Sequence, residues 1–213
     1  MRKPVREIKG VMAVMPIANI NTDAIIPSVW LRTATADMGK GLFSRQRYDE
    51  EGRENPDFIL NRPAFRETKI LLADENFGCG SSREAAVWAL VQFGIGCVLA
   101  PSFADIFYEN AFRNGLIAGV IEPATYQVLK AAAAAHEGSP DFRVDLPSTS
   151  VVAPDGRAYP FAIPTSRALA LMRGDDEIAI TLQHAQVIED HYQAARTTSD
   201  WLFPAALERS TAR

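Results

Sequence analysis

The stretch KILLADENFGCGSSREAAVWALVQFG, residues 69–94, determines the fold that the rest of the chain must accommodate. It begins with an apolar run, residues 70–73, whose length suits a buried β-strand. A turn with two glycines follows at residues 76–80, and glycine takes backbone angles that are closed to other residues. From Ser81 onward the apolar residues have helical spacing. The sequence therefore predicts a strand, a glycine loop and a helix in direct succession.

The predicted start of this helix carries Ser81, Ser82 and Arg83. Unpaired N–H groups and the positive end of the helix dipole attract anions at such a position, and two hydroxyls and a guanidinium would add to that attraction. The spacing of Ser81 and Glu84 also matches a capping box, in which both side chains only bind the first N–H groups of the helix. The residues alone leave both interpretations open. The loop is not a P-loop, because no lysine follows its second glycine.

Composition limits the classes of function. The 213 residues carry a net charge of −4 and a pI near 5.4, so there is no basic surface for nucleic acid or an anionic membrane. The basic N-terminus is not followed by the apolar core of a signal peptide, so we expect a cytoplasmic protein. Cys79 and Cys97 are too few to hold an iron–sulfur cluster, and the three histidines have no metal-ligand spacing.

We expect one domain over residues 1–213, built from parallel strand–loop–helix units with extra strands from both ends. A polar stretch at residues 34–57 predicts a long loop, and the tail after about residue 197 is expected to be loosely held. Asp23 ends a run of turn-forming residues and precedes an apolar segment, which also suits a simple turn cap. The other expected elements are strands at 11–17, 97–100, 116–121, 142–146, 151–153 and 158–163, and helices at 28–33, 103–113, 123–135, 164–172 and 183–196.

Five blocks in order carry a resemblance to a known family. They are NTDAIIP (21–27), NPDFILN (55–61), ENFGCGSSRE (75–84), APSFADIFYENAFRNGL (100–116) and TLQH (181–184). With these blocks the chain resembles the small subunits of the 3-isopropylmalate dehydratases, in the aconitase superfamily.

This resemblance implies an α/β fold, the three-layer β/β/α swivelling domain of the aconitase C-terminal type. It implies a separate large subunit that holds a [4Fe-4S] cluster, and no metal ligand from this chain. The implied reaction removes water from 2-isopropylmalate and returns it to the neighbouring carbon in leucine biosynthesis. Two alternatives are a related hydratase for citraconate or citramalate, maleate or a homoaconitate-like diacid, and a binding module without activity.

The family's motif assigns roles to four residues of the implied site. Ser81 would be the base that removes a proton next to a carboxylate, with Ser82 or the loop capping the helix in its place. Arg83 would bind a substrate carboxylate through two hydrogen bonds, and Ser82 would donate another. Asp23 would orient these groups. Cys79 is usual in the family's glycine loop, where packing is its expected role.

The family's specificity segment corresponds to residues 29–33, so Trp30, Leu31 and Arg32 would face the group that differs among substrates. An arginine in an isopropyl pocket would lose its hydration without gaining a partner. Either Arg32 points away and Trp30 or Leu31 contacts the alkyl group, or the substrate carries a further carboxylate. Ala85 departs from the family, which usually has histidine there, and this bears on the substrate more than on the class of reaction.

Overall fold

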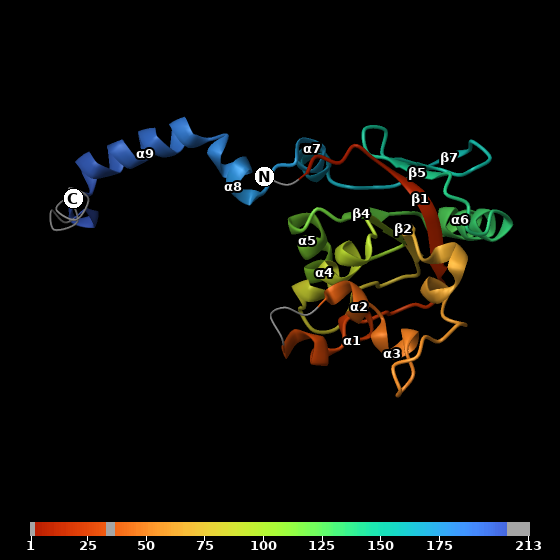
Figure 1. Ribbon diagram of the computed structural model, residues 1–213. Coiled ribbons are helices and arrows are strands. Elements are labelled where there is room, and N and C mark those ends of the chain that lie inside the picture. Colours follow the sequence, from red (N-terminus) through yellow and green to blue (C-terminus); the bar gives the residue numbers. More distant parts are fainter. Residues whose placement is uncertain (1–2, 33–36, 204–213) are drawn as a thin grey trace. The chain divides into compact units, whose positions relative to one another are not determined.

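Seven strands form one sheet within the part of the chain that the computed structural model describes, residues 3–32 and 37–203 (Figure 1). Their order across the sheet is β4-β3-β2-β1-β5-β6-β7. The strands are β1 (Glu7–Met15), β2 (Thr68–Ala73), β3 (Cys97–Ala100), β4 (Ile117–Val120), β5 (Phe142–Asp145), β6 (Ser150–Val152) and β7 (Ala158–Pro160). Strands β1 to β4 are parallel, and β5, β6 and β7 are antiparallel to their neighbours. Strand β1 joins the parallel and the antiparallel part of the sheet, since it pairs with β2 and with β5.

Helices connect and follow these strands. They are α1 (Thr22–Ile25), α2 (Met38–Gly41), α3 (Ser44–Arg47), α4 (Glu84–Phe93), α5 (Asp105–Arg113), α6 (Pro123–Ala135), α7 (Thr165–Arg173), α8 (Glu177–Leu182) and α9 (Ala185–Thr198), with 3-10 turns η1 (Ser28–Arg32), η2 (Ile59–Asn61), η3 (Pro63–Phe65) and η4 (Asp200–Leu202). The predicted strands and helices occur in the predicted order with shifted ends, but η1 stands where a helix was expected, and α1, α2, α3 and α8 were not predicted.

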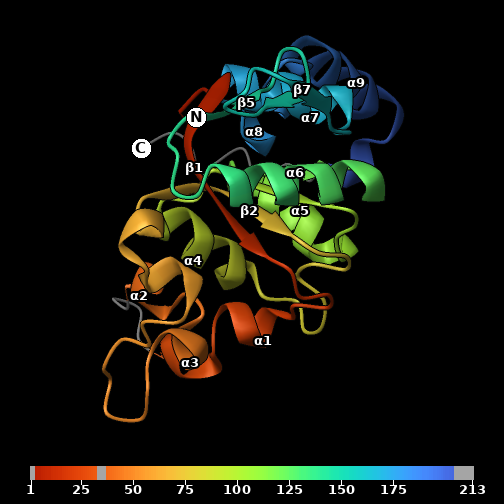
Figure 2. The ribbon, with the colours of Figure 1, turned by 90° about the vertical axis from the view of Figure 1, so that its right-hand side faces the viewer.

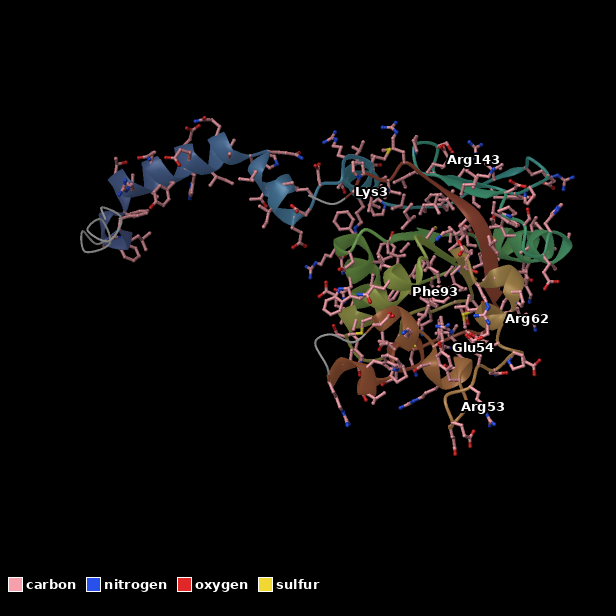
Figure 3. The ribbon with its side chains drawn as sticks, in the orientation of Figure 1. Lys3, Arg53, Glu54, Arg62, Phe93 and Arg143 are labelled. Carbon is pink, nitrogen blue, oxygen red and sulfur yellow. The ribbon has the colours of Figure 1, made fainter. Side chains whose placement is uncertain are left out.

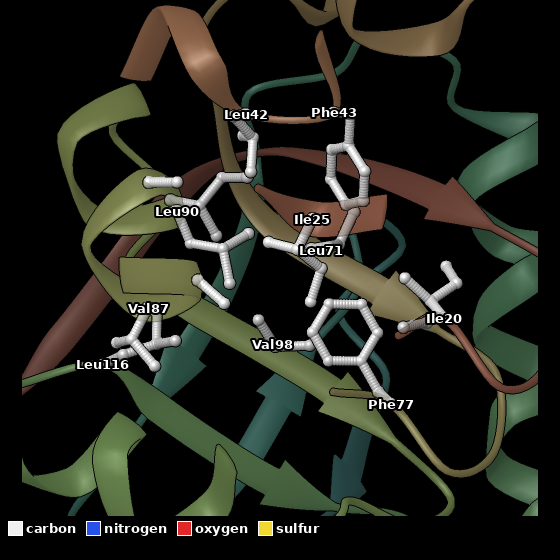
Figure 4. Close-up of a cluster of buried hydrophobic side chains, with 14 of the residues drawn as sticks. Ile20, Ile25, Leu42, Phe43, Leu71, Phe77, Val87, Leu90, Val98 and Leu116 are labelled. Carbon is white, nitrogen blue, oxygen red and sulfur yellow. The ribbon is translucent and has the colours of Figure 1, made fainter. Parts of the chain in front are cut away.

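The parallel strands send alternate side chains into two cores, because successive residues of a strand point to opposite faces. In β2, Leu71 packs in the core shared with α4, and Leu72 packs in the core shared with β5 and β6. Figure 4 shows the first core, where Leu71 and Val98 of the sheet meet Leu90 of α4. Helices α4 and α5, the parallel strands and the antiparallel strands thus form three layers (Figure 2), and α6 and α7 contribute side chains to the second core. The predicted β/β/α arrangement is confirmed.

The stretch predicted as a loop, residues 34–57, contains two short helices. Residues 34–36 lie outside the described part, but α2 and α3 follow them. Leu42 and Phe43, between these two short helices, are fully buried in the first core, and that burial holds the segment in place. Only its tip, with Arg53, extends from the body (Figure 3), whereas Glu54 pairs with Arg66.

The described residues fall into two compact units, one ending at Gly174 and the other beginning at Asp175. The first contains both cores. The second consists of α8, α9 and η4, and neither of its two α-helices has a buried residue. The predicted final helix is present as α9, whereas residues 204–213 of the predicted tail lie outside the description. The single domain over residues 1–213 stays a prediction. Among the described helices, none has the length and apolar character needed to cross a bilayer.

Candidate functional site

Two segments far apart in sequence run side by side at the carboxyl ends of β1 and β2. The Gly78 N–H donates to the Ile20 carbonyl at 2.8 Å, and the Thr22 N–H donates to the Cys79 carbonyl at 2.9 Å. The Thr22 hydroxyl donates to the Ser81 carbonyl at 2.7 Å. Carboxyl ends of parallel strands meet at one edge of a sheet, so the loops that follow β1 and β2 become neighbours there.

This pairing brings Asp23 against Arg83. Nη1 of Arg83 lies 2.5 Å from a carboxylate oxygen of Asp23, and it also donates to the Ile26 carbonyl at 3.4 Å. The Arg83 side chain is 19% exposed and that of Asp23 is 42% exposed. The guanidinium is therefore held in one place, yet one side of it remains open to a ligand.

The capping alternative for Ser81 and Ser82 is wrong. Helix α4 begins only at Glu84, its N-cap residue is Arg83, and no side chain caps it. Glu84 accepts a hydrogen bond from Asn114 at 2.8 Å instead of turning back on the helix. Both serines are exposed in the loop before α4. Their hydroxyls are thus available at the edge of the pocket described next.

A pocket of about 240 Å³ lies between the start of α4 and the start of α5. Its lining residues are Thr22, Gly78, Gly80, Ser81, Ser82, Arg83, Ala104, Asp105, Ile106 and Phe107. Polar groups from the glycine loop face a mainly apolar wall of Ala104, Ile106 and Phe107, in which Asp105 is the one charged residue. The positive ends of two helix dipoles border the pocket, which favours an anionic ligand with an apolar part.

Sequence reasoning missed the contribution of residues 104–107. A usable signal was present, because these residues follow strand β3, which is parallel to β2. The loops after parallel neighbours meet at the same edge, so α5 had to begin beside the glycine loop. The helix predicted at 103–113 begins two residues later, as α5 at Asp105, and Ser102 Oγ before it accepts from the Asn76 N–H at 2.8 Å.

The glycine loop owes its close packing to Gly78. This residue has φ +79°, and a Cβ atom there would lie 2.2 Å from Cγ of Phe107. The rings of Phe77 and Phe107 meet edge to face at 5.2 Å between centroids. The loop is therefore fixed against α5 by packing as well as by hydrogen bonds.

The predicted specificity residues lie elsewhere. Trp30, Leu31 and Arg32 belong to η1, and the residues that line the pocket include none of them. The indole N–H of Trp30 donates to Ser44 Oγ at 2.9 Å, whereas Leu31 and Arg32 are exposed. Residue 33, the last of the predicted segment, lies outside the described residues. Ala85 is buried in the first core and does not line the pocket, so it acts through packing there.

Neither cysteine joins a metal-binding group. Cys97 is buried on β3, and burial raises the pKa of its thiol. Cys79 is half-buried, and its thiol donates to the Asn19 carbonyl at 3.3 Å. Across residues 3–32 and 37–203, no three His, Cys, Asp or Glu side chains gather closely enough to bind a metal ion. The residues described here do not fit an iron–sulfur cluster.

Comparison with known proteins gives consistent matches. Residues 2–122 match the model of the aconitase C-terminal domain. The small subunits of 3-isopropylmalate dehydratase from Cereibacter sphaeroides and Rhodopseudomonas palustris are 43% and 45% identical to this chain. The alignments cover 92% and 91% of this chain and 98% and 96% of those proteins. The crystal structure of 3-isopropylmalate dehydratase from Methanocaldococcus jannaschii matches with a TM-score of 0.59 and 27% identity, over 87% of this chain and 99% of that one.

Proposed function

Because the chain belongs to the aconitase C-terminal domain family and, within it, to the small subunits of 3-isopropylmalate dehydratase, we propose that it acts in the cytoplasm as one subunit of a two-subunit hydro-lyase. The proposed reaction converts 2-isopropylmalate into 3-isopropylmalate in leucine biosynthesis, through an alkene formed by loss of water. The observation that carries this proposal is the Arg83–Asp23 ion pair at a pocket that Ser81 and Ser82 also line.

Ser81 is the proposed base, and it removes a proton from the CH₂ carbon next to a carboxylate. A neutral hydroxyl is too weak for this step, so its anionic form must be stabilised. The start of α4 and the guanidinium of Arg83 supply positive potential at the same pocket. The proton then returns to the carbon that carries the isopropyl group. Hydroxide leaves the carbon that carries the isopropyl group, and hydroxide adds to the former CH₂ carbon, so the reaction neither gains nor loses water overall.

Arg83 is the proposed carboxylate clamp. Its contacts to Asp23 and Ile26 both use Nη1, which leaves Nη2 and Nε for a carboxylate with matching planar geometry. Asp23 positions the guanidinium, and Ser82 donates a further hydrogen bond. Trp30, Leu31 and Arg32 stay proposed as contacts for the group that varies among substrates.

The proposed partner is a large subunit with a [4Fe-4S] cluster. Bound there, the cluster would supply Lewis acidity toward the substrate hydroxyl and carboxylate. Support for a separate carrier comes from the ligand chemistry, since Cys97 is buried in a core and Cys79 has no second thiol beside it. No residue of this chain is proposed as a cluster ligand.

An anaerobic assay of this chain mixed with its cluster-loaded large subunit tests the proposal. The ultraviolet absorbance of the conjugated alkene is followed with 2-isopropylmalate, 3-isopropylmalate and citramalate in parallel, with each subunit alone as control. We expect turnover of the two isopropylmalates by the mixture only. Preference for citramalate would show that the substrate is a different diacid. Inactivity with an intact cluster would favour a binding module.

Ser81→Ala is expected to lower kcat by at least about a hundredfold, the usual contribution of a positioned base. The fold should remain, because the side chain is exposed in a loop. Ser82→Ala serves as the matched variant and should lose about tenfold, as one hydrogen-bond donor is removed. Equal kinetics of Ser81→Ala and the unaltered chain would exclude Ser81 as the base.

A further inference from the structure

Thr22 is a buried polar residue of the segment after β1, where that segment pairs with the glycine loop. Its side chain is 2% exposed, its hydroxyl donates to the Ser81 carbonyl, and its N–H donates to the Cys79 carbonyl. The next residue, Asp23, pairs with Arg83. We propose that Thr22 is a positioning residue, which fixes the peptide between Ser81 and Ser82 for the reaction. This inference rests on the proposed function.

The direction of the Ser81 carbonyl matters because the pocket is proposed to hold a carboxylate. A carbonyl oxygen turned toward an anion would repel it, whereas an N–H group would attract it. The C=O and N–H of a trans peptide point in opposite directions. When Thr22 binds the Ser81 carbonyl, the Ser82 N–H points away from Thr22, and the oxygen is occupied by a donor.

The Thr22 hydroxyl is not needed for the helix in which it lies. Asn21 is the N-cap of α1, and its side chain accepts from the Ala24 N–H at 2.8 Å. Thr22 instead bonds to a residue 59 positions away in sequence. Its hydroxyl therefore acts on the loop that carries Ser81.

Thr68 offers a matched control. It is 0% exposed at the start of β2, and its hydroxyl donates to the Phe65 carbonyl at 2.6 Å. It does not line the pocket. Thr22→Val and Thr68→Val thus each delete one buried hydroxyl-to-carbonyl bond and conserve the shape of the side chain. Only the first deletion concerns the loop of Ser81.

The test compares kinetics of the reconstituted enzyme. We expect both valine variants to lower Tm to a similar extent. Only Thr22→Val should lower kcat by at least about tenfold, because small displacements of a reacting group are costly. Thr22→Ser keeps the donor and should return kcat to within about threefold of the unaltered enzyme. Equal kcat values for the two valine variants, or no rescue by serine, would overturn the proposal.

Amide hydrogen exchange of the full chain gives a readout that does not depend on activity. The N–H groups of residues 81–83 should exchange faster in Thr22→Val than in Thr68→Val. If the unaltered mixture fails to turn over isopropylmalates, the proposed function fails while this exchange pattern still decides the role of Thr22. Unchanged exchange at residues 81–83 would overturn that role.

Discussion

Arg83 combines two properties that a carboxylate site requires, namely a fixed position and open donors. Its Nη1 is bound to Asp23 and to the Ile26 carbonyl, which prevents the side chain from adopting other rotamers. The ion pair is partly exposed, so its contribution to folding stability is small. Its value for the proposed reaction lies in orientation, since the planar guanidinium has a defined direction.

Arg83→Lys is expected to lower kcat/KM by at least about tenfold, because an ammonium group cannot make two parallel bonds to a carboxylate. Kinetics of the reconstituted complex measure the change. Arg143→Lys is the control: Arg143 also pairs with a carboxylate, that of Glu7 at 3.3 Å, but lies on β5 (Figure 3). Normal kinetics in Arg83→Lys would show that another residue binds the substrate carboxylate.

The residues that the glycine loop contributes to the candidate site, Ser81, Ser82 and Arg83, could be found from the sequence, but the start of α4 could not. Ser81 and Glu84 have the spacing of a capping box, in which the Ser81 carbonyl accepts the first helical hydrogen bond. That carbonyl is bound to the Thr22 hydroxyl instead. The contact with Thr22, 59 residues away in sequence, therefore prevents the capping box that the local spacing predicts. The spacing of residues within one segment cannot reveal such a contact.

At the scale of the element, the glycine loop could be predicted from its own sequence, although its contact with a neighbouring element could not. Its strand, turn and helix were predicted from local patterns, because apolar run length and glycine act locally. Its partner, the first turn of α5, was not, since the order of strands in the sheet has to be known first. The short helices α2 and α3 were missed because their buried residues lie in a polar stretch.

Gly78→Ala should destabilise the protein by about 3 kcal/mol. About 1–2 kcal/mol comes from the left-handed backbone and the remainder from the clash with Phe107. Gly52→Ala separates the two contributions, because Gly52 also has φ +79° but nothing lies within 4 Å of its Cβ position. Chemical denaturation measures both variants. A loss for Gly78→Ala no larger than that for Gly52→Ala would show that the loop relaxes around the added methyl group.

At the scale of the whole molecule, both cores lie in the unit that ends at Gly174. The last buried apolar residue of the described chain is Leu171, in α7. Helix α7 ends at Arg173, and its C-cap residue Gly174 has a φ of +76°. The described residues beyond it contribute no side chain to either core.

A chain that ends at Gly174 is therefore expected to unfold cooperatively, with a Tm within about 3 °C of the full chain. Circular dichroism during heating measures this transition. A peptide of residues 175–203 should be only partly helical, because isolated helices of this length are marginal in water. Loss of the cooperative transition in the shortened chain would mean that residues after Gly174 are needed for the core.

The pairing of β1 with two different strands also sets an order of assembly during synthesis. Its parallel partner β2 ends at Ala73, whereas its antiparallel partner β5 begins only at Phe142. All four parallel strands therefore leave the ribosome before β5 does. Until then, one edge of β1 has unpaired N–H and C=O groups that another chain can bind. The newborn chain is thus most prone to aggregate between the emergence of β4 and that of β5.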